Sequence, residues 1–544
     1  MNYSLTRHGL GLIRIVFDYS PRLIAVMRRL RGAWYSRIDN TPGWICPVNP
    51  YNISILRGAF SRLDAALTPP EEGKAIVLPK NRVDLTCVRA EDIPVKGLHP
   101  YQVEGVAFLE SLGGRGLIAD EMGLGKTLQA LAWSSLNEKA RPVLVVCPAS
   151  VKLHWKRQIH KWLGKPSVYI CRGRKPPEKM PAMEFFIINY DILNGWADFL
   201  KHFNIKLMIL DEVHYIKSRT AKRTKAVQGL AGRIKYLIGL TGTPAKNRPA
   251  DIFHPIQLIQ PGVLPSWWNF ITRYCGAKFN GYGWDYSGAT NTKELHTILT
   301  HTVMIRRTKE QVMKDLPPIT RSMMPMEIDD RDEYNLAEQD FRAWAKEQKN
   351  VKITKEAIAN ALSRLEILKQ LCVRLKMPMM IEWIRDFLAN DEKLVIFCTH
   401  KWTVGAIMQA FQPVAVRIEG DTKEEARDKN IRLFCDRGKV RLLVANIVAG
   451  GVGIDGLQGA ANNLAFAELA WTPADHDQAE SRLHRIGQKG AVTAWYLVAP
   501  NTVEDRIVSV LDSKQKVISS LVDGKESKSD STMMEILKGY QDED

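Results

Sequence analysis

The chain has 544 residues, which is too long for one hydrophobic core and predicts two large domains and an accessory one. Its 45% hydrophobic and 25% charged residues are ordinary for a globular protein. The 76 Lys and Arg exceed the 59 Asp and Glu, and the net charge of +17 favours a polyanionic partner, either nucleic acid or an anionic membrane surface.

Targeting and metal signals are weak. No segment approaches the length of a membrane span, and Arg7, His8 and Arg14 interrupt the apolar residues at the start, which argues against a signal peptide. The eight cysteines are scattered and form no pair with two-residue spacing, which argues against a zinc module and for reduced thiols. We therefore expect an intracellular protein that is not held in a membrane.

The first half of the chain predicts a module, a linker and a parallel sheet. Residues 1–67 form the expected N-terminal module, and the stretch with Pro69-Pro70 and Pro79 predicts a linker at 68–97. The first lobe is expected at 98–330, and from Leu98 to about Ile259 short apolar runs alternate with helical stretches, as successive βα units require. The expected strands are 116–119, 143–147, 185–189, 207–210 and 236–240. Ligands of such a sheet bind at the carboxyl ends of its strands.

A glycine-punctuated turn follows the first of these strands. Its sequence is Asp120-Glu121-Met122-Gly123-Leu124-Gly125-Lys126-Thr127. Glycines let backbone N–H groups approach phosphate oxygens, Lys126 can reach the β- and γ-phosphates, and the Thr127 hydroxyl can ligate Mg²⁺. The general pattern has glycine where Asp120 stands, so the turn alone leaves a plain loop open.

A pair of acids supports the phosphate interpretation. Asp211 and Glu212 follow the apolar run 207–210, which is typical of a buried parallel strand. In nucleotide hydrolases the first acid holds Mg²⁺ and the second polarises the attacking water. Together the two motifs predict a site for a nucleoside triphosphate with Mg²⁺, in which Thr127 and Asp211 are the metal ligands.

The second half predicts another sheet. Residues 331–390 have helical periodicity and are expected to form a hinge with helical projections. The apolar runs 394–398, 414–418, 441–445, 463–467 and 494–499 predict a second parallel-sheet lobe at 391–522. Residues 523–544 are polar and predict a mobile tail.

The segment 477–488 links the two halves. Arg482 and Arg485 are three residues apart, so on a helix both would point at one ligand across a cleft, although spacing alone is equally compatible with a solvated basic face. The whole string, Asp477-Gln478-Ala479-Glu480-Ser481-Arg482-Leu483-His484-Arg485-Ile486-Gly487-Gln488, closely resembles the last motif of the Snf-type DNA translocases, a branch of helicase superfamily two. The resemblance extends from Leu98 to about Leu511.

This resemblance implies roles for further residues. Leu98-His99-Pro100-Tyr101-Gln102 is similar to the family's adenine-reading segment, and the turn 120–127 matches the family's own phosphate loop, including its acid. Two positions depart from the pattern, since alanine is usual at Val213 and a small uncharged residue at Asp455. The implied DNA contacts are Lys152, Asn189, Lys246, Asn247, Lys401 and Trp471.

Within the family, the annealing-helicase branch is the most similar. The segments around Tyr274-Cys275, Gly283–Ala289 and Met304-Ile305-Arg306-Arg307 carry this resemblance. That branch has an accessory module called the HepA-related-protein domain. Residues 15–63 are compatible with its strand, helix, strand, strand, helix order, and also with a plain capping domain.

The sequence thus predicts an α/β fold with two tandem RecA-like doubly wound parallel-sheet lobes, helical insertions and a small N-terminal α+β module. The expected function is that of a DNA-dependent ATPase that hydrolyses ATP between its two lobes and moves along duplex or forked DNA, in fork remodelling, strand annealing or repair. The expected nucleotide-binding residues are Gln102 and the turn Asp120, Glu121, Met122, Gly123, Leu124, Gly125, Lys126 and Thr127. The expected catalytic residues are Lys126, Thr127, Asp211, Glu212, Gln478, Arg482 and Arg485.

ATP and Mg²⁺ are the expected cofactors, and DNA is the expected partner of a monomeric motor without membrane attachment. The expected location is the cytoplasm, at the nucleoid of a bacterium or a viral host, or the nucleus in a eukaryote. Two alternatives stay open, namely an RNA-dependent or strand-separating helicase and a catalytically silent DNA-binding scaffold. The presence of all the ATP-motif residues disfavours the scaffold.

Overall fold

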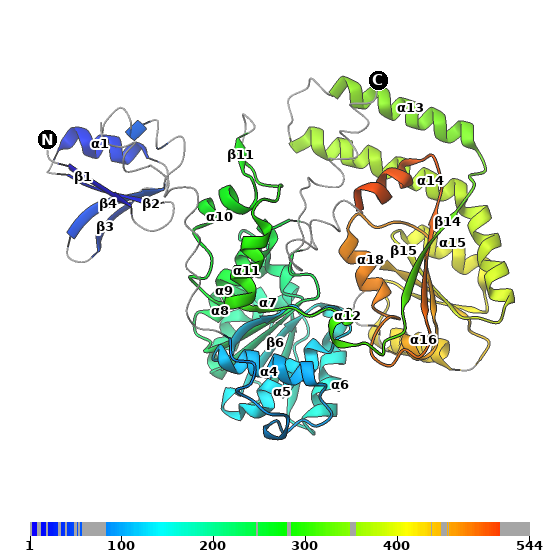
Figure 1. The fold of residues 1–544 in the computed structure, drawn as a ribbon, viewed down its shortest axis with the longest axis horizontal. Helices are drawn as coiled ribbons and strands as arrows, with labels where there is room; N and C mark the ends of the chain where they lie inside the picture. The colour runs from blue at the N-terminus through cyan, green and yellow to red at the C-terminus, as the bar shows by residue number, and fades with distance from the viewer. Residues whose placement is uncertain are drawn as a thin grey trace.

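The computed structural model describes residues 3–7, 12–17, 20–30, 34–38, 41–47, 52, 55–56, 83–245, 248–279, 284–348, 355–436, 438–447, 454 and 456–511. Within these ranges the protein has a small N-terminal sheet and two larger sheets that lie side by side as separate lobes (Figure 1). None of the helices in these ranges combines the length and the apolar character needed to cross a membrane.

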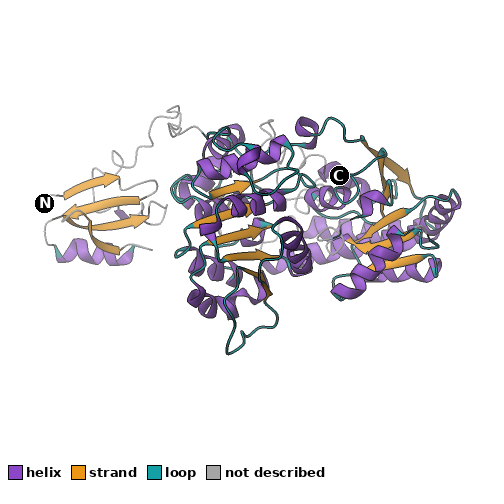
Figure 2. Ribbon diagram, turned by 90° about the horizontal axis from the view of Figure 1, so that it is seen from below, coloured by secondary structure: helices purple, strands orange, loops and turns teal. Residues whose placement is uncertain are grey.

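The N-terminal sheet is antiparallel and has the strand order β1-β2-β4-β3. Its elements are β1 (Tyr3–Arg7), β2 (Leu12–Phe17), α1 (Pro21–Arg29), β3 (Trp34–Ile38) and β4 (Thr41–Pro47). The side chain of Ser20 caps α1 by accepting a hydrogen bond from the N–H of Leu23. The sheet lies to one side of the first lobe in both ribbon views (Figures 1 and 2).

The first lobe contains a seven-stranded parallel sheet. In spatial order its strands are β13 (Met304–Ile305), β5 (Arg115–Ile118), β10 (Tyr236–Leu240), β9 (Leu207–Asp211), β6 (Val143–Cys147), β8 (Phe185–Asn189) and β7 (Val168–Ile170). All five expected strands are present, and the sequence analysis missed β7 and β13. The central strands are buried on both faces, so their side chains pack into two separate hydrophobic cores, one on each face of the sheet.

Helices cover both faces of this sheet (Figure 2). One core contains side chains from α4 (Pro100–Ser111), α5 (Lys126–Leu136) and α6 (Lys152–Trp162). The opposite core contains side chains from α7 (Tyr190–Leu200), α8 (Lys222–Ala231), α9 (Ala250–Ile259), α10 (Trp267–Tyr274) and α11 (Thr292–Thr302). A short hairpin, β11 (Lys278–Phe279) with β12 (Trp284–Asp285), follows α10.

The second lobe contains a six-stranded parallel sheet. Its spatial order is β14 (Ile319–Pro325), β19 (Val492–Val498), β18 (Asn463–Phe466), β15 (Leu394–Cys398), β17 (Leu442–Asn446) and β16 (Ala415–Ile418). Strand β14 falls inside the range 98–330 expected for the first lobe, yet its whole length pairs with β19. The second sheet therefore begins before residue 330, because an edge strand can be supplied from the chain that connects the lobes.

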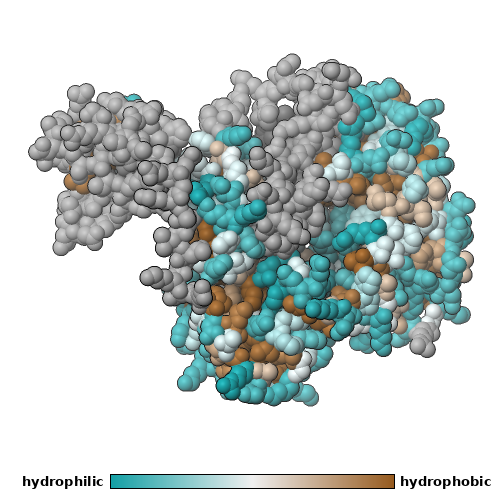
Figure 3. All heavy atoms as spheres, viewed as in Figure 1, coloured by the Kyte–Doolittle hydropathy of each residue, from teal (hydrophilic) through white to brown (hydrophobic). Residues whose placement is uncertain are grey.

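The remaining helices join or cover the lobes. Two long helices, α13 (Arg331–Gln348) and α14 (Lys355–Ala389), occupy most of the expected helical range 331–390. The others are α12 (Lys309–Val312), α15 (Lys401–Phe411), α16 (Glu424–Cys435) and α18 (Pro473–Glu480). In Figure 1, α12 lies between the lobes and α18 lies on the side of the second lobe that faces the first. Figure 3, seen from the same side as Figure 1, shows the described surface of the two lobes as a mosaic of hydrophilic and hydrophobic side chains.

Candidate functional site

Three loops of the first lobe meet because their strands are neighbours. Strands β5, β10 and β9 lie side by side, and their carboxyl ends lead into the turn 120–127, the turn 241–244 and the acids Asp211-Glu212. Parallel strands present their carboxyl ends at one edge, which is where doubly wound sheets bind ligands. The strand order thus gathers motifs that are far apart in the chain.

The turn 120–127 depends on two glycines. Gly123 has φ 90° and Gly125 has φ 75°, and this left-handed backbone is readily accessible only to glycine. Gly125 also stands directly before the first residue of α5, so the N–H groups of that helix point into the turn. A Cβ atom on Gly123 would lie 2.9 Å from Cβ of Arg485, so the absent side chain lets the second lobe approach the turn.

Lys126 is folded back into the turn. Its Nζ donates hydrogen bonds to the carbonyl oxygens of Asp120 at 2.8 Å and Glu121 at 3.2 Å. Burial lowers the pKa of Lys126 to about 8, although the nearby carboxylates of Glu212 and Asp120 favour the charged form. Two carbonyl oxygens thus hold a buried ammonium group at the mouth of the turn.

Asp120 has a structural role in this arrangement. Its buried carboxylate accepts hydrogen bonds from Nε of Arg307 at 3.0 Å, from Nη2 of Arg307 at 2.6 Å and from Nε2 of Gln129 at 2.9 Å. The backbone N–H of Arg307 donates to the same carboxylate at 3.1 Å. The acid that replaces the usual glycine therefore fastens the turn to the chain that follows β13.

We expect Asp120→Ala to destabilise the first lobe by about 3–5 kcal/mol, because it leaves the buried guanidinium of Arg307 without its buried acid partner and with only the exposed carboxylate of Glu104. Urea unfolding followed by circular dichroism would measure the change. Asp198→Ala is the matched control, since it breaks an exposed pair with Lys201 and is expected to leave the unfolding midpoint unchanged. Equal midpoints for the two variants would contradict the assigned role of Asp120.

Asp211 is held by three neighbours at the end of β9. Its Oδ2 accepts a hydrogen bond from the indole N–H of Trp155 at 2.8 Å, and its Oδ1 accepts one from the N–H of Glu212 at 3.1 Å. The hydroxyl of Tyr190 donates to its backbone carbonyl at 2.8 Å. Burial and the adjacent Glu212 raise the pKa of Asp211. A bound cation would relieve this repulsion between the two acids.

Glu212 has an unusual backbone and a stable negative charge. Its φ of 50° is rare for a residue with a side chain and occurs most often at functional sites. Its Oε2 accepts a hydrogen bond from the Thr241 hydroxyl at 3.2 Å and lies 3.2 Å from Nδ1 of His214. Burial acts to raise the pKa of Glu212, but His214, Lys126 and Thr241 outweigh it and lower the pKa. The carboxylate is therefore ionised at neutral pH.

The second lobe reaches this acid directly. Nε2 of Gln478, in the last turn of α18, donates a hydrogen bond to Oε1 of Glu212 at 3.4 Å. Beside it, Nζ of Lys309 lies 3.2 Å from the hydroxyl of Ser481 and 3.2 Å from Oε1 of Glu121. These contacts place α18 over the carboxyl edge of the first sheet.

A cleft of about 290 Å³ opens between the lobes at this point. Its walls include Glu121, Met122 and Gly242 from the first lobe and Asp477, Ser481 and His484 from the second. A Cβ atom on Gly242 would lie 3.4 Å from Nζ of Lys126, so the cleft borders the phosphate-loop lysine. Next to this cleft, at the carboxyl edge of the first sheet, the turn with Lys126 meets the acids Asp211 and Glu212 and the amide of Gln478. Backbone donors, a lysine, two acids and an amide are the equipment for phosphoryl chemistry.

The sequence analysis considered Arg482 and Arg485 on one face of a helix, but the structure does not place them on a common helix. Helix α18 ends at Glu480, and the chain continues in tight turns in which the N–H of Arg482 bonds to the carbonyl of Ala479. Arg482 donates from Nη1 to the carbonyl of Ile454 in its own lobe at 3.3 Å, whereas Arg485 packs its Cβ against Gly123. Only Arg485 is placed against the turn 120–127 by these contacts.

Comparison with known protein families agrees with this geometry. Residues 101–377 match the model of the SNF2-related domain, and residues 377–487 match the helicase conserved C-terminal domain. The chain belongs to the SNF2 family. It thereby joins the ATPases of helicase type, and the two matched domains correspond in order to the two lobes.

Two similar relatives of this SNF2 chain come from vertebrates. The SWI/SNF-related matrix-associated actin-dependent regulator of chromatin subfamily A-like protein 1 of Xenopus laevis is 35% identical over 467 residues, covering 83% of this chain and 47% of the relative. The human DNA annealing helicase and endonuclease ZRANB3 is 31% identical over 447 residues, covering 79% of this chain and 41% of the relative. The chain therefore spans less than half the length of these relatives.

Among solved structures, the Sulfolobus solfataricus SWI2/SNF2 ATPase core in complex with double-stranded DNA is similar to this chain. It is 24% identical with a TM-score of 0.40, and the match covers 80% of this chain and 95% of that structure.

The remaining expected ATP residue, Gln102, is buried beside the phosphate loop of this SNF2 chain. Its Oε1 accepts a hydrogen bond from the N–H of His99 at 3.0 Å, and its Nε2 donates to the carbonyl of Leu124 at 3.2 Å. The amide thus caps α4 and touches the turn at once. Thr127 is half-buried in the first turn of α5.

The expected DNA contacts lie on both lobes. In the first lobe, Nζ of Lys152 donates to Oδ1 of Asn189 at 3.1 Å, so these two residues are already joined. In the second lobe, Lys401 forms an exposed ion pair with Asp421 at 2.5 Å, and the half-buried Trp471 donates to Glu366. Lys246 and Asn247 lie outside the described residues, as does Asp455.

Sequence reasoning gave no role to Arg306 and Lys309. Nη1 of Arg306 donates to the carbonyl oxygens of Ala119 at 2.8 Å and Gly242 at 3.1 Å, and so joins the start of the phosphate loop to the turn after β10. Lys309 joins Glu121 to Ser481 across the cleft. The available signal was the basic run that begins directly after Met304-Ile305, which forms the edge strand β13.

Proposed function

We propose that the chain is an ATP-dependent translocase that hydrolyses ATP between its two lobes and moves along duplex or forked DNA. The hydrogen bond between Gln478 and Glu212 at 3.4 Å carries this proposal, because it joins the second lobe to the acid that would activate water. Hydrolysis at such a boundary depends on closure of the lobes, so it can drive their movement.

ATP would bind with its phosphates in the turn 120–127. The backbone N–H groups around Gly123 and Gly125 would donate to phosphate oxygens, and Nζ of Lys126 would exchange its two carbonyl partners for the β- and γ-phosphates. Phosphate charge would also raise the pKa of Lys126 above its present value. Gln102 would read the adenine edge by exchanging hydrogen bonds that it now makes within the protein.

Glu212 would act as the general base. Its ionised carboxylate is held by Thr241 and His214, so it can accept a proton from the attacking water. Gln478 would orient that water or the γ-phosphate, and Arg485, with Arg482 after a change of partner, would neutralise charge that develops on the γ-phosphate.

Thr127 and Asp211 suit a Mg²⁺ ion that arrives with the nucleotide. Mg²⁺ takes hard oxygen ligands, and it is usually held by one or two protein groups together with phosphates. When bound, the ion would shield the phosphate charge and polarise the γ-phosphate.

DNA would follow the carboxyl edges of both sheets. The proposed contacts are Lys152, Asn189, Lys246, Asn247, Lys401 and Trp471. Such contacts go mainly to the phosphate backbone, so binding should be nearly independent of sequence and sensitive to salt. The net charge of +17 supports a polyanionic partner, and the ZRANB3 relative is named a DNA annealing helicase.

We place the biological role at forks, in strand annealing, fork remodelling or repair, because the relatives include annealing helicases. The motor would work as a monomer wherever the DNA is, in a cytoplasmic nucleoid or a nucleus. The domains proposed for it are a module at 1–67, a linker at 68–97, a first lobe that begins at 98 and ends before β14, a second lobe formed by β14 and 391–522 with helices at 331–390, and a tail at 523–544.

The test is steady-state ATP hydrolysis without nucleic acid and with duplex DNA, forked DNA, single-stranded DNA or RNA. We expect duplex or forked DNA to stimulate hydrolysis strongly, and Lys126→Ala to abolish it. Stimulation by RNA alone would instead favour an RNA-dependent helicase. Failure to hydrolyse ATP under any condition would favour a silent DNA-binding scaffold.

A further inference from the structure

Two side chains of the long helix α14 hold the indole ring of Trp471. Its indole N–H donates a hydrogen bond to Oε2 of Glu366 at 2.7 Å, and the ammonium of Lys369 lies 5.0 Å from the centre of its ring. The side chain of Lys369 is only 1% exposed. A buried lysine over an indole ring and a carboxylate on the indole N–H fix the ring in two directions.

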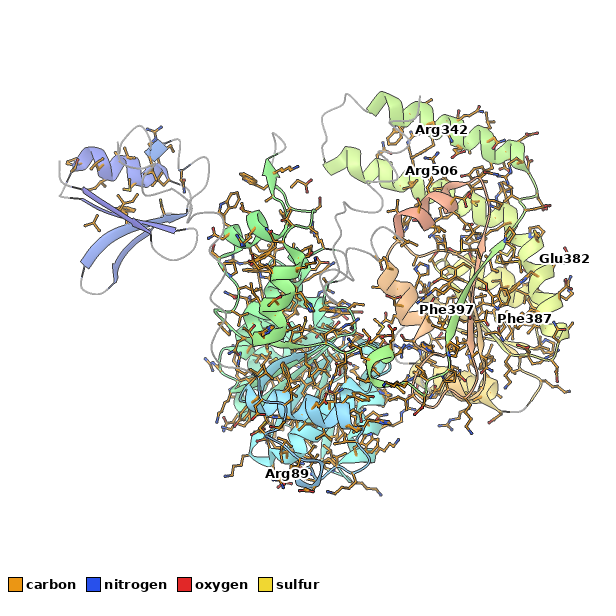
Figure 4. All side chains as sticks on the ribbon, in the orientation of Figure 1. Arg89, Arg342, Glu382, Phe387, Phe397 and Arg506 are labelled. Carbon is orange, nitrogen blue, oxygen red and sulfur yellow. The ribbon has the colours of Figure 1, made fainter. Side chains whose placement is uncertain are left out.

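A histidine connects this carboxylate to a second one. Nε2 of His400 lies 2.9 Å from Oε1 of Glu366, and Nδ1 lies 2.5 Å from Oε2 of Glu468, which is fully buried. The hydroxyl of Thr399 donates to the same oxygen of Glu468. We call Glu366, His400 and Glu468 the brace. Phe397, labelled in Figure 4, marks the strand that delivers His400 three residues later.

Helix α18 connects Trp471 to the ATP site. Trp471 stands two residues before the helix, and Gln478 lies in its last turn. His476 pins the turn before the helix, because its Nε2 accepts from the N–H of Ala470 at 3.2 Å and its Nδ1 donates to the carbonyl of Thr472 at 3.2 Å. One short helix thus has the brace near its start and Glu212 near its end.

We propose that the brace positions Trp471 for DNA and that α18 transmits the engagement of DNA to Gln478. This inference rests on the proposed function and extends it to residues that make no contact with the phosphate loop. Glu366, His400 and Glu468 are positioning residues, since they act through Trp471. Loss of the brace would loosen the start of α18 and weaken the response to DNA, while hydrolysis without DNA would continue.

The charge of His400 in the brace makes the strength of the brace depend on pH. Hydrogen bonds to Glu366 and Glu468 raise the pKa of His400 to about 9, although burial and the charge of Lys369 oppose this. A group whose pKa rises on folding stabilises the fold below its unfolded pKa of about 6.5, and this stabilisation is lost as the pH rises through the folded pKa. The brace should therefore weaken near pH 9.

The first experiment measures the duplex DNA concentration that gives half of the maximal ATPase stimulation. We expect His400→Gln to raise this concentration about tenfold at neutral pH, which corresponds to the loss of a charge-assisted hydrogen bond, and to leave the rate without DNA unchanged. In the unaltered chain the concentration should rise between about pH 7.5 and about pH 9.5, whereas in His400→Gln it should stay nearly constant. His202→Gln, an exposed histidine of the first lobe, is the control.

The second experiment measures hydrogen exchange of the backbone amides at 470–480 without DNA or nucleotide. We expect faster exchange in His400→Gln than in the unaltered chain or in His202→Gln. Faster exchange with an unchanged response to DNA would overturn the proposed transmission, and unchanged exchange would overturn the brace itself. If no nucleic acid stimulates the unaltered chain, the proposed function fails, while the exchange measurement still judges the brace.

Discussion

Glu212→Gln is expected to bind ATP and hydrolyse it about 10²- to 10⁴-fold more slowly at saturating duplex DNA, because the amide cannot accept a proton from water. The substitution preserves the shape of the side chain, and its carbonyl oxygen can still accept the hydrogen bond from Thr241. The backbone strain at φ 50° also remains, so folding should be little affected. Single-turnover hydrolysis would measure the rate, and a fluorescent ATP analogue would measure binding.

Glu310→Gln is the matched control, because this exposed acid lines the cleft between the lobes and has no part in the contacts described for Glu212. It should hydrolyse ATP as fast as the unaltered chain. A Glu212→Gln protein that keeps its full rate would show that another group takes the proton. Loss of ATP binding in that variant would instead indicate that Glu212 holds the nucleotide.

The sequence predicted the elements of both lobes more completely than their arrangement. Strands such as 143–147 and 185–189 are short, apolar and bounded by polar turns, so local pattern alone identifies them. The edge strand β13 has two residues and carries no periodicity that would identify it. Strand β14 was not predicted, and its residues were included in the range expected for the first lobe, because pairing partners depend on contacts across the whole chain.

Long-range pairing also explains what was missed at the site. The spacing of the turn 120–127 predicted a phosphate loop, but nothing local indicates that Asp120 bonds to Arg307, which is 187 residues away. The same holds for Arg306, which bonds to Ala119 at the end of β5. A site whose residues lie within one turn can be predicted from the sequence, whereas ion pairs between distant segments can be assigned only once the sheet order is known.

In the segment 477–488 the local pattern itself led to a wrong expectation. A helical interpretation of 477–488 placed Arg482 and Arg485 on one face, but α18 stops at Glu480. In the turns that follow, Arg482 bonds to the carbonyl of Ile454, whereas Arg485 packs against Gly123. The structure therefore favours Arg485 as the residue that reaches the phosphate loop, and this distinction leads to the second large effect.

Arg485→Ala is expected to lower ATP hydrolysis by about 10³- to 10⁵-fold at saturating duplex DNA, which is the range for an arginine that stabilises a phosphoryl-transfer transition state. Its Cβ packs against Gly123, so its side chain starts at the phosphate loop from the opposite lobe. Because that charge matters most in the transition state, ATP binding should fall much less than the rate. Single-turnover hydrolysis and ATP binding would be measured together.

Arg485→Lys separates charge from geometry, since lysine keeps the charge but lacks the planar fork of donors, and it should recover only part of the rate. Arg432→Ala removes an exposed arginine from α16 of the same lobe and controls for the loss of positive charge alone. If Arg485→Ala behaves like Arg432→Ala, the second lobe does not supply the catalytic charge through this residue. Arg482, which would then have to leave the carbonyl of Ile454, becomes the residue to test.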